Sequence, residues 1–99
     1  MQLTANEELE LRYMQALGFK WIARDANENV YAYDIKPYIK FIKLIGKNVY
    51  TNGDEGDYMR CEIGEYDFLK WEDEPLEIDK LLRENGKDVE LVYPDIELL

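Results

Sequence analysis

The chain has 99 residues, a length typical of one domain with a hydrophobic core of its own. Its 22 acidic and 12 basic residues give a formal charge of -10, which disfavours direct nucleic-acid binding and favours a basic protein surface as partner. The single cysteine excludes an intramolecular disulfide, and no apolar run or leader-like start indicates a membrane span or a secretion signal. We therefore expect one domain, residues 1–99, that works in the cytoplasm and away from membranes.

The first predicted element is a helix that begins near Thr4 and ends near Gly18. Thr4 followed three residues later by Glu7 fits a capping box, and a glycine is typical of the position where a helix stops. Apolar residues recur at helical spacing and predict the face that packs on a sheet: Ala5, Leu9, Tyr13, Ala16 and Leu17.

A β-hairpin follows, and the rest of the chain is predicted to fold around it. Its arms are residues 20–24 and 30–35, both rich in β-branched or aromatic residues, with turn-forming residues 25–29 between them. Pro37 ends the second arm because proline donates no ladder hydrogen bond. Alternation places Trp21 with Ala23 on one face, and Tyr31 with Tyr33 on one face. We expect Trp21 to be buried against the first helix.

Residues 38–51 are compatible with a strand or a helix. Three lysines in this stretch, with Lys36 just before it, recur at helical spacing, but the residues between them are mostly β-branched or aromatic, which favours a strand that turns at residues 46–48. The lysines have two interpretations, a basic contact strip or, more commonly, a solvated face: Lys36, Lys40, Lys43 and Lys47.

Residues 52–57 form a loop by composition, and they do not match the ligand spacing of a calcium loop. A strand is predicted from Tyr58 to Ile63, with Cys61 inside it as a small buried hydrophobe. An aromatic strand near Tyr66 then leads to a second helix, with Pro75 in its first turn and acidic residues complementing its dipole. Its buried stripe and stop are Ile78, Leu81, Leu82 and Asn85-Gly86.

A last strand, residues 88–93, and a short tail, residues 94–99, complete the layout. The predicted fold class is α+β: a small antiparallel sheet built around a hairpin, with an N-terminal helix and a second helix near residues 75–85 packed on it. The chain has no histidine, so it lacks the commonest general base and metal ligand. We therefore predict no enzyme activity, no catalytic residues, no metal site and no cofactor.

Three stretches resemble a group of small proteins from phages and mobile elements of Gram-positive bacteria. They are Trp-Ile-Ala-Arg-Asp at 21–25, Tyr-x-Tyr-x-x-Lys-Pro at 31–37 and Phe-Leu-Lys-Trp-Glu-Asp-Glu-Pro-Leu-Glu-Ile at 68–78, and the resemblance spans residues 9–83. The middle departs from the group, because residues 38–41 stand where a tryptophan is expected. The group has no assigned catalytic residues, so the resemblance transfers none. It implies a role against host defence or in phage gene regulation, and some small acidic proteins of such elements inhibit CRISPR nucleases or restriction enzymes.

From the acidity and this resemblance, we predict an anti-defence inhibitor that acts in the cytoplasm of the host cell. Its carboxylates would occupy the place of nucleic-acid phosphates on a host nuclease or another nucleic-acid-binding protein, while the chain itself binds no nucleic acid. Exposed tyrosines such as Tyr31, Tyr33 or Tyr66 would anchor the contact. The alternative is a non-catalytic interaction module that assembles or regulates a phage protein complex. The predicted partner-binding residues are Glu72, Asp73, Glu74, Glu77, Asp79, Asp54, Glu55 and Asp57.

Overall fold

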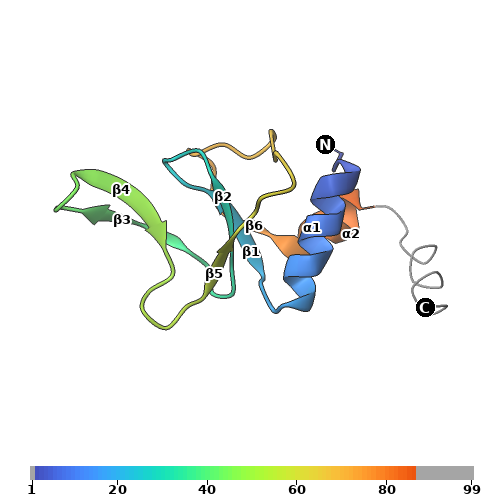
Figure 1. Cartoon of the computed structure of the whole chain (residues 1–99), viewed down its shortest axis with the longest axis horizontal. Helices are drawn as coiled ribbons and strands as arrows, with labels where there is room; N and C mark the ends of the chain where they lie inside the picture. Colours follow the sequence, from blue (N-terminus) through green and yellow to red (C-terminus); the bar gives the residue numbers. More distant parts are fainter. Residues whose placement is uncertain (1, 87–99) are drawn as a thin grey trace.

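The structure, a computed structural model, describes residues 2–86, so the strand and tail predicted for residues 88–99 lie outside the described residues. Figure 1 shows two helices at one end, a small sheet in the middle and a projecting hairpin at the other end. The elements are α1 (Ala5–Ala16), β1 (Trp21–Arg24), β2 (Val30–Tyr33), β3 (Tyr38–Ile42), β4 (Lys47–Thr51), β5 (Tyr58–Arg60), β6 (Leu76–Glu77) and α2 (Ile78–Asn85). This arrangement confirms the predicted α+β class.

The predicted hairpin lies at the centre of the main sheet. The strand order is β5-β2-β1-β6, every pairing is antiparallel, and Trp21 lies opposite Tyr33. The second arm ends at Tyr33 rather than Ile35, because the chain bends at residues 34–35 and Asp34 donates its backbone N–H to the carbonyl of Asp57. β3 and β4 form a separate two-stranded sheet.

Both helices contribute to one hydrophobic core on a single face of the main sheet. The core joins Leu11 and Met14 of α1 to Ile78 and Leu81 of α2, against sheet residues such as Ile22. Burying a side chain of this size contributes about 1.5–3 kcal/mol. The buried stripe and the stop of α2 at Gly86 are as predicted. Neither α1 nor α2, the helices in the described residues, is long and apolar enough to cross a bilayer.

The predicted buried face of α1 is wrong, although its capping box is confirmed. Leu9, Tyr13 and Leu17 of the predicted stripe are exposed, whereas the acidic residues Glu7 and Glu10 are buried. Apolar spacing alone therefore selected the wrong side of this helix. The reason lies in the loop at residues 62–66.

The carboxylate of Glu10 organises this loop. It accepts hydrogen bonds from the backbone N–H groups of Glu62, Ile63 and Gly64, at 2.7, 2.9 and 3.0 Å, and from the Tyr66 hydroxyl at 2.7 Å. The Glu7 carboxylate accepts from the N–H groups of Thr4 and Tyr66, at 3.0 and 2.6 Å. Buried carboxylates are tolerated when they are fully hydrogen-bonded, and these bonds are worth about 1.5–3 kcal/mol each. The acidic face of α1 therefore holds the 62–66 loop in place.

The expectation that Trp21 is buried against the first helix is also wrong. Trp21 is half-buried on the helix-free face of the sheet, where it packs with Ala23, Tyr33 and Tyr50. The Lys36 Nζ atom lies 5.0 Å from the centre of the Trp21 ring. Strand alternation explains the placement: Ile22, the next residue, occupies the helix side. The predicted shared faces, Trp21 with Ala23 and Tyr31 with Tyr33, agree with the register.

The strand prediction for residues 38–51 is confirmed, but the turn lies earlier than predicted. Gly46 has a φ of 64°, which favours glycine, and β4 already begins at Lys47. The carbonyls of Ile42 and Lys43 accept from Ile45 and Gly46, at 3.2 and 3.3 Å. This hairpin projects away from the helices (Figure 1).

The connection from β5 to α2 departs from the prediction in three places. β5 ends at Arg60, so Cys61 follows the strand, buried as predicted, and Tyr66 lies in a loop. Pro75 precedes β6 instead of starting α2. The reason is that Leu76 and Glu77 pair with Ile22 and Trp21 of β1, which holds them extended until Ile78.

Candidate functional site

The predicted partner-binding acids lie in three places. All eight are exposed, and none forms an ion pair with another residue of the described range. Asp57 comes just before β5 and Glu77 lies in β6, at opposite edges of the four-stranded sheet, which is about 14 Å across three strand spacings. The structure therefore does not bring the two predicted groups together.

Glu72, Asp73 and Glu74 lie in the turn before β6. The Asp73 carboxylate caps this turn by accepting from the Lys70 N–H at 2.8 Å, and the Asp73 carbonyl accepts from the Tyr50 hydroxyl at 2.8 Å. Asp73 is therefore committed to structure. The side chains of Glu72 and Glu74 remain available to a partner.

Glu77 and Asp79 lie at the start of α2. Glu77 occupies the N-cap position but its side chain makes no capping hydrogen bond. The Asp79 carboxylate accepts from Gln15 Nε2 at 2.7 Å and so links α2 to α1. The acids at this helix start are thus fewer than predicted, because residues 72–74 precede the strand.

The loop that holds Asp54, Glu55 and Asp57 is anchored by Asn52, a buried residue that the sequence analysis did not single out. Asn52 Nδ2 donates to the Asp34 carboxylate at 3.1 Å and to the Asp57 carbonyl at 2.9 Å. Asp34 also accepts from the Asp57 N–H at 2.9 Å. The backbone of the loop is therefore fixed, while its three acidic side chains face solvent.

A further acidic surface joins parts of the chain that are distant in sequence. We call it the acidic hollow, a depression of about 390 Å³ whose acidic lining residues are Glu28, Glu65, Asp67 and Glu72. All four are exposed, and no ion pair within residues 2–86 involves them. Of the four, only Glu72 is among the partner-binding residues predicted from the sequence. The other three come from the β1–β2 turn and the 61–75 connection, and their proximity has no local sequence signal.

Arg24 holds the walls of the acidic hollow together. Its guanidinium donates to the carbonyls of Leu69 and Tyr66, at 2.6 and 2.8 Å, and also to the carbonyls of Glu65 and Glu28. One side chain thus joins the β1–β2 turn to the 65–69 loop. Because its donors are used on carbonyl groups, Arg24 fixes the backbone that carries Glu28, Glu65 and Asp67.

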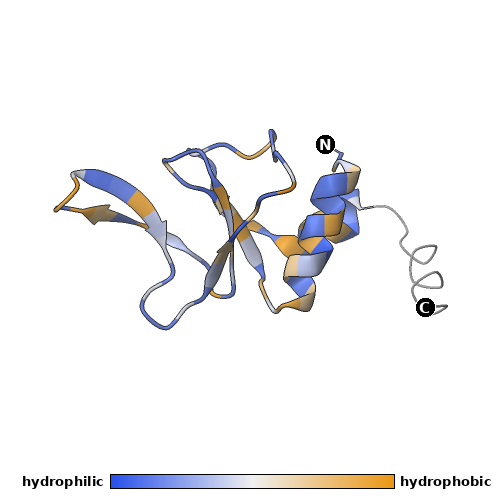
Figure 2. Ribbon diagram, in the orientation of Figure 1, coloured by the Kyte–Doolittle hydropathy of each residue, from blue (hydrophilic) through white to orange (hydrophobic). Residues whose placement is uncertain are grey.

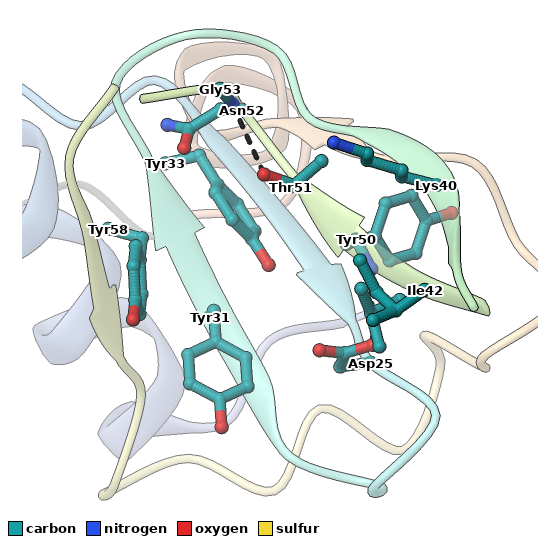
Figure 3. A pocket seen from close by; sticks show the side chains of 11 residues that line it. Asp25, Tyr31, Tyr33, Lys40, Ile42, Tyr50, Thr51, Asn52, Gly53 and Tyr58 are labelled. Atoms are coloured by element: carbon teal, nitrogen blue, oxygen red, sulfur yellow. Dashed lines mark hydrogen bonds between the residues drawn. The ribbon is translucent and has the colours of Figure 1, made fainter. Parts of the chain in front are cut away.

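The tyrosines lie mainly at a second depression, between the sheet and the projecting hairpin. Figure 3 shows Tyr31, Tyr33 and Tyr58 side by side on the sheet face, with Tyr50 across from them. We call this the tyrosine cleft; its volume is about 340 Å³. The rings of Tyr31, Tyr33 and Tyr58 lie 6.0 to 6.5 Å apart. Of the predicted tyrosine anchors, Tyr33 and Tyr66 are buried and only Tyr31 is partly accessible.

Burial keeps two tyrosines of the tyrosine cleft and the buried Cys61 protonated at neutral pH. Burial raises the pKa of Tyr33 and, with the nearby carboxylates of Glu74 and Asp25, that of Tyr50, so both phenols stay protonated at neutral pH. Burial also raises the pKa of the Cys61 thiol to about 12, which disfavours the nucleophilic thiolate. Within the described part of the chain, no three acidic or sulfur ligands come together as a metal site.

Comparison with known proteins gave no relative: no family model, no curated protein and no solved structure matches the chain. The functional conclusion therefore depends on the geometry of the surfaces described above.

Proposed function

We propose that this protein is a non-catalytic anti-defence inhibitor of a phage or mobile element. It binds a host nuclease, such as a CRISPR effector or a restriction enzyme, on the surface that the nuclease uses for nucleic acid. The observation that supports this proposal is the acidic hollow, where four exposed carboxylates without ion-pair partners in residues 2–86 outnumber the two basic residues of the lining, Arg24 and Lys70. Such a surface complements the arginines and lysines that bind phosphates.

The rigidity of the acidic hollow favours binding. Arg24 ties the carbonyls of Glu28, Glu65 and Leu69 to one guanidinium, so the backbone positions of the acids are set before a partner arrives. Preorganisation lowers the entropy cost of association. Trp71, which is partly exposed, also lines the depression and supplies an aromatic surface for an arginine side chain.

The test begins with capture of the partner from a host lysate, followed by competition. A nucleic-acid enzyme that is recovered on the immobilised protein and displaced by added DNA or RNA supports the proposal. The partner is then titrated with the triple variant Glu65→Lys, Asp67→Lys, Glu72→Lys. We expect Kd to rise and the binding free energy to weaken by several kcal/mol, because each close charge pair couples by about 1.5 kcal/mol or more.

A matched control reverses the same number of charges in the loop before β5: Asp54→Lys, Glu55→Lys, Asp57→Lys. This variant has the same net charge as the first, so nonspecific attraction changes equally in both. The proposal expects the control to weaken binding far less. Equal losses would mean that only overall charge matters, and full inhibition by the hollow variant would remove the hollow from the contact.

The second candidate function is an interaction module that assembles or regulates a phage protein complex. The observation that favours it is the β3–β4 hairpin, where Tyr38, Ile39, Phe41, Leu44 and Ile45 are all more than half exposed. Apolar surface of this extent is typical of a protein contact. A captured partner that is encoded by the phage and indifferent to added nucleic acid would favour this function over inhibition.

A further inference from the structure

The β3–β4 hairpin, which we call the arm (residues 38–51), differs in chemistry from the rest of the molecule. It contains three lysines and no acidic residue, whereas the other described residues contain 18 acids and eight bases. Leu44 at its tip is 95% exposed, and Ile45 beside it is 54% exposed. In Figure 2 the tip and β3 are coloured as hydrophobic. The arm is therefore an apolar and basic projection. We call the rest of the described chain, residues 2–37 and 52–86, the body, and its charge is acidic.

The body carries an apolar groove that nothing in the described structure fills. This groove lies between α1 and β5, has a volume of about 460 Å³, and is lined by Leu9, Tyr13, Met14, Met59 and Ile63. Leu9 is 62% exposed, although it belongs to the helical stripe that was predicted to be buried. Glu62, an exposed acidic residue, also borders the groove.

We propose that the arm of one copy of this chain docks in the α1–β5 groove of a second copy, head to tail. The apolar tip, Leu44 and Ile45, enters the apolar groove, and the lysines of the arm face the acidic body of the neighbour. β5 is an edge strand of its sheet, so its outer backbone groups are positioned to pair with a strand of the arm. The two surfaces match in polarity. Arg60 and Glu62, both exposed, border the groove with opposite charges, so the charge attraction comes from the excess of acids over the body as a whole.

The other arrangements of two copies fit less well. An arm cannot fill the groove of its own chain, because the arm projects at the end of the molecule opposite the helices (Figure 1). Its strands have five residues each, a reach of about 16 Å. A symmetric contact between two arms would bring lysines against lysines, which is destabilising in paired strands. The head-to-tail contact also leaves a free arm and a free groove, so it continues to larger assemblies or closed rings.

The test uses two variants of the full chain in sedimentation velocity over a wide range of concentrations. The arm variant is Leu44→Asp, Ile45→Asp, and the groove variant is Leu9→Glu, Tyr13→Glu; all four positions are exposed, so both variants are expected to keep the wild-type melting curve. Wild type should associate as concentration rises. Each variant alone should associate about 100-fold more weakly or worse, because a charge without a partner enters the contact.

Mixing the variants gives the decisive result. The groove variant keeps its arm and the arm variant keeps its groove, so a 1:1 mixture should form a heterodimer and nothing larger. A wild-type chain that stays monomeric at every concentration would overturn the proposal, as would a groove variant that associates like wild type or a mixture without heterodimer. A monomeric chain whose arm binds a labelled DNA duplex, and loses that binding in the arm variant, would also overturn it and assign the arm to nucleic acid.

Discussion

The body buries large apolar side chains in a core, whereas the arm leaves most of its own exposed. In the body, apolar side chains fill a core, and the buried carboxylates of Glu7 and Glu10 have hydrogen-bond donors around them. In the arm, two five-residue strands pair only with each other and leave most of their large apolar side chains in solvent, while Tyr50 alone among the arm residues is buried, against the body. A two-stranded sheet gains little stability by itself. The contrast indicates that the body maintains the fold, and it is the reason for proposing that the arm contacts another molecule.

The largest difference between the two regions should appear on removal of a leucine. Leu11→Ala in the body should lower the free energy of unfolding by about 2–5 kcal/mol, because Leu11 is fully buried in the core. Leu44→Ala at the tip of the arm should change it by no more than about 0.5 kcal/mol. Denaturant unfolding at low protein concentration measures both. Similar losses in the two variants would contradict the division into body and arm.

Removal of a buried carboxylate should give the next largest effect. Glu10→Ala leaves three backbone N–H groups and the Tyr66 hydroxyl without their acceptor. We expect a net loss of about 2–4 kcal/mol, less than the sum of four bonds, because the three N–H groups are only partly buried and water replaces part of what they lose. The matched control is Glu62→Ala, an exposed carboxylate in the same loop, which should change stability by less than about 0.5 kcal/mol. Urea titrations of both variants test this. If Glu10→Ala were as stable as Glu62→Ala, the acidic face of α1 would not hold the loop.

A smaller effect is expected from alkaline pH. Burial, with the nearby carboxylate of Glu10, raises the pKa of Cys61 from 9.0 to about 12. The unfolded chain therefore loses this proton first. The stability contributed by the neutral thiol is complete below about pH 9 and is lost as pH rises toward 12.

Between about pH 9 and 12, Cys61 alone should lower the free energy of unfolding by about 1.4 kcal/mol per pH unit. Cys61→Ala should reduce the loss of stability between pH 8 and 10 by about 1 kcal/mol. Unfolding midpoints at several pH values measure it. The buried phenols Tyr33 and Tyr66 act in the same direction and are present in both proteins. An unchanged pH dependence in the variant would show that Cys61 is not protected by the core.

The sequence predicted those parts of the fold that depend on local rules. The capping box at Thr4, the central hairpin and the buried stripe of α2 follow from spacing and residue type, and the structure agrees. The buried face of α1 could not be predicted in this way, because its donors lie 52 to 59 residues away in the chain. Periodicity has no information about such partners.

The sequence allowed a less complete prediction of the binding surfaces than of the fold. The acids near residues 72–79 were recognised by composition, but the acidic hollow requires Glu28 to meet Glu65 and Asp67. That meeting depends on Arg24, whose carbonyl acceptors in the 65–69 loop are 41 to 45 residues away. The placement of Pro75 before β6 depends likewise on pairing with β1, more than fifty residues earlier. Long-range contacts of this kind leave no local pattern.

The most direct measurement of the difference between body and arm is hydrogen–deuterium exchange of the full chain in dilute solution and again at high concentration. In dilute solution, amides of β1 and β2 should exchange only through global unfolding, whereas amides of β3 and of the tip should exchange much faster, since no residue from 38 to 46 is buried. Tyr50 of β4 is the exception in the arm, because it is buried against Ala23 and Tyr33 of the body. At high concentration the arm and the α1–β5 groove should both gain protection. An arm protected as strongly as β1 and β2 in dilute solution would contradict the account, because the arm would then be part of the stable fold.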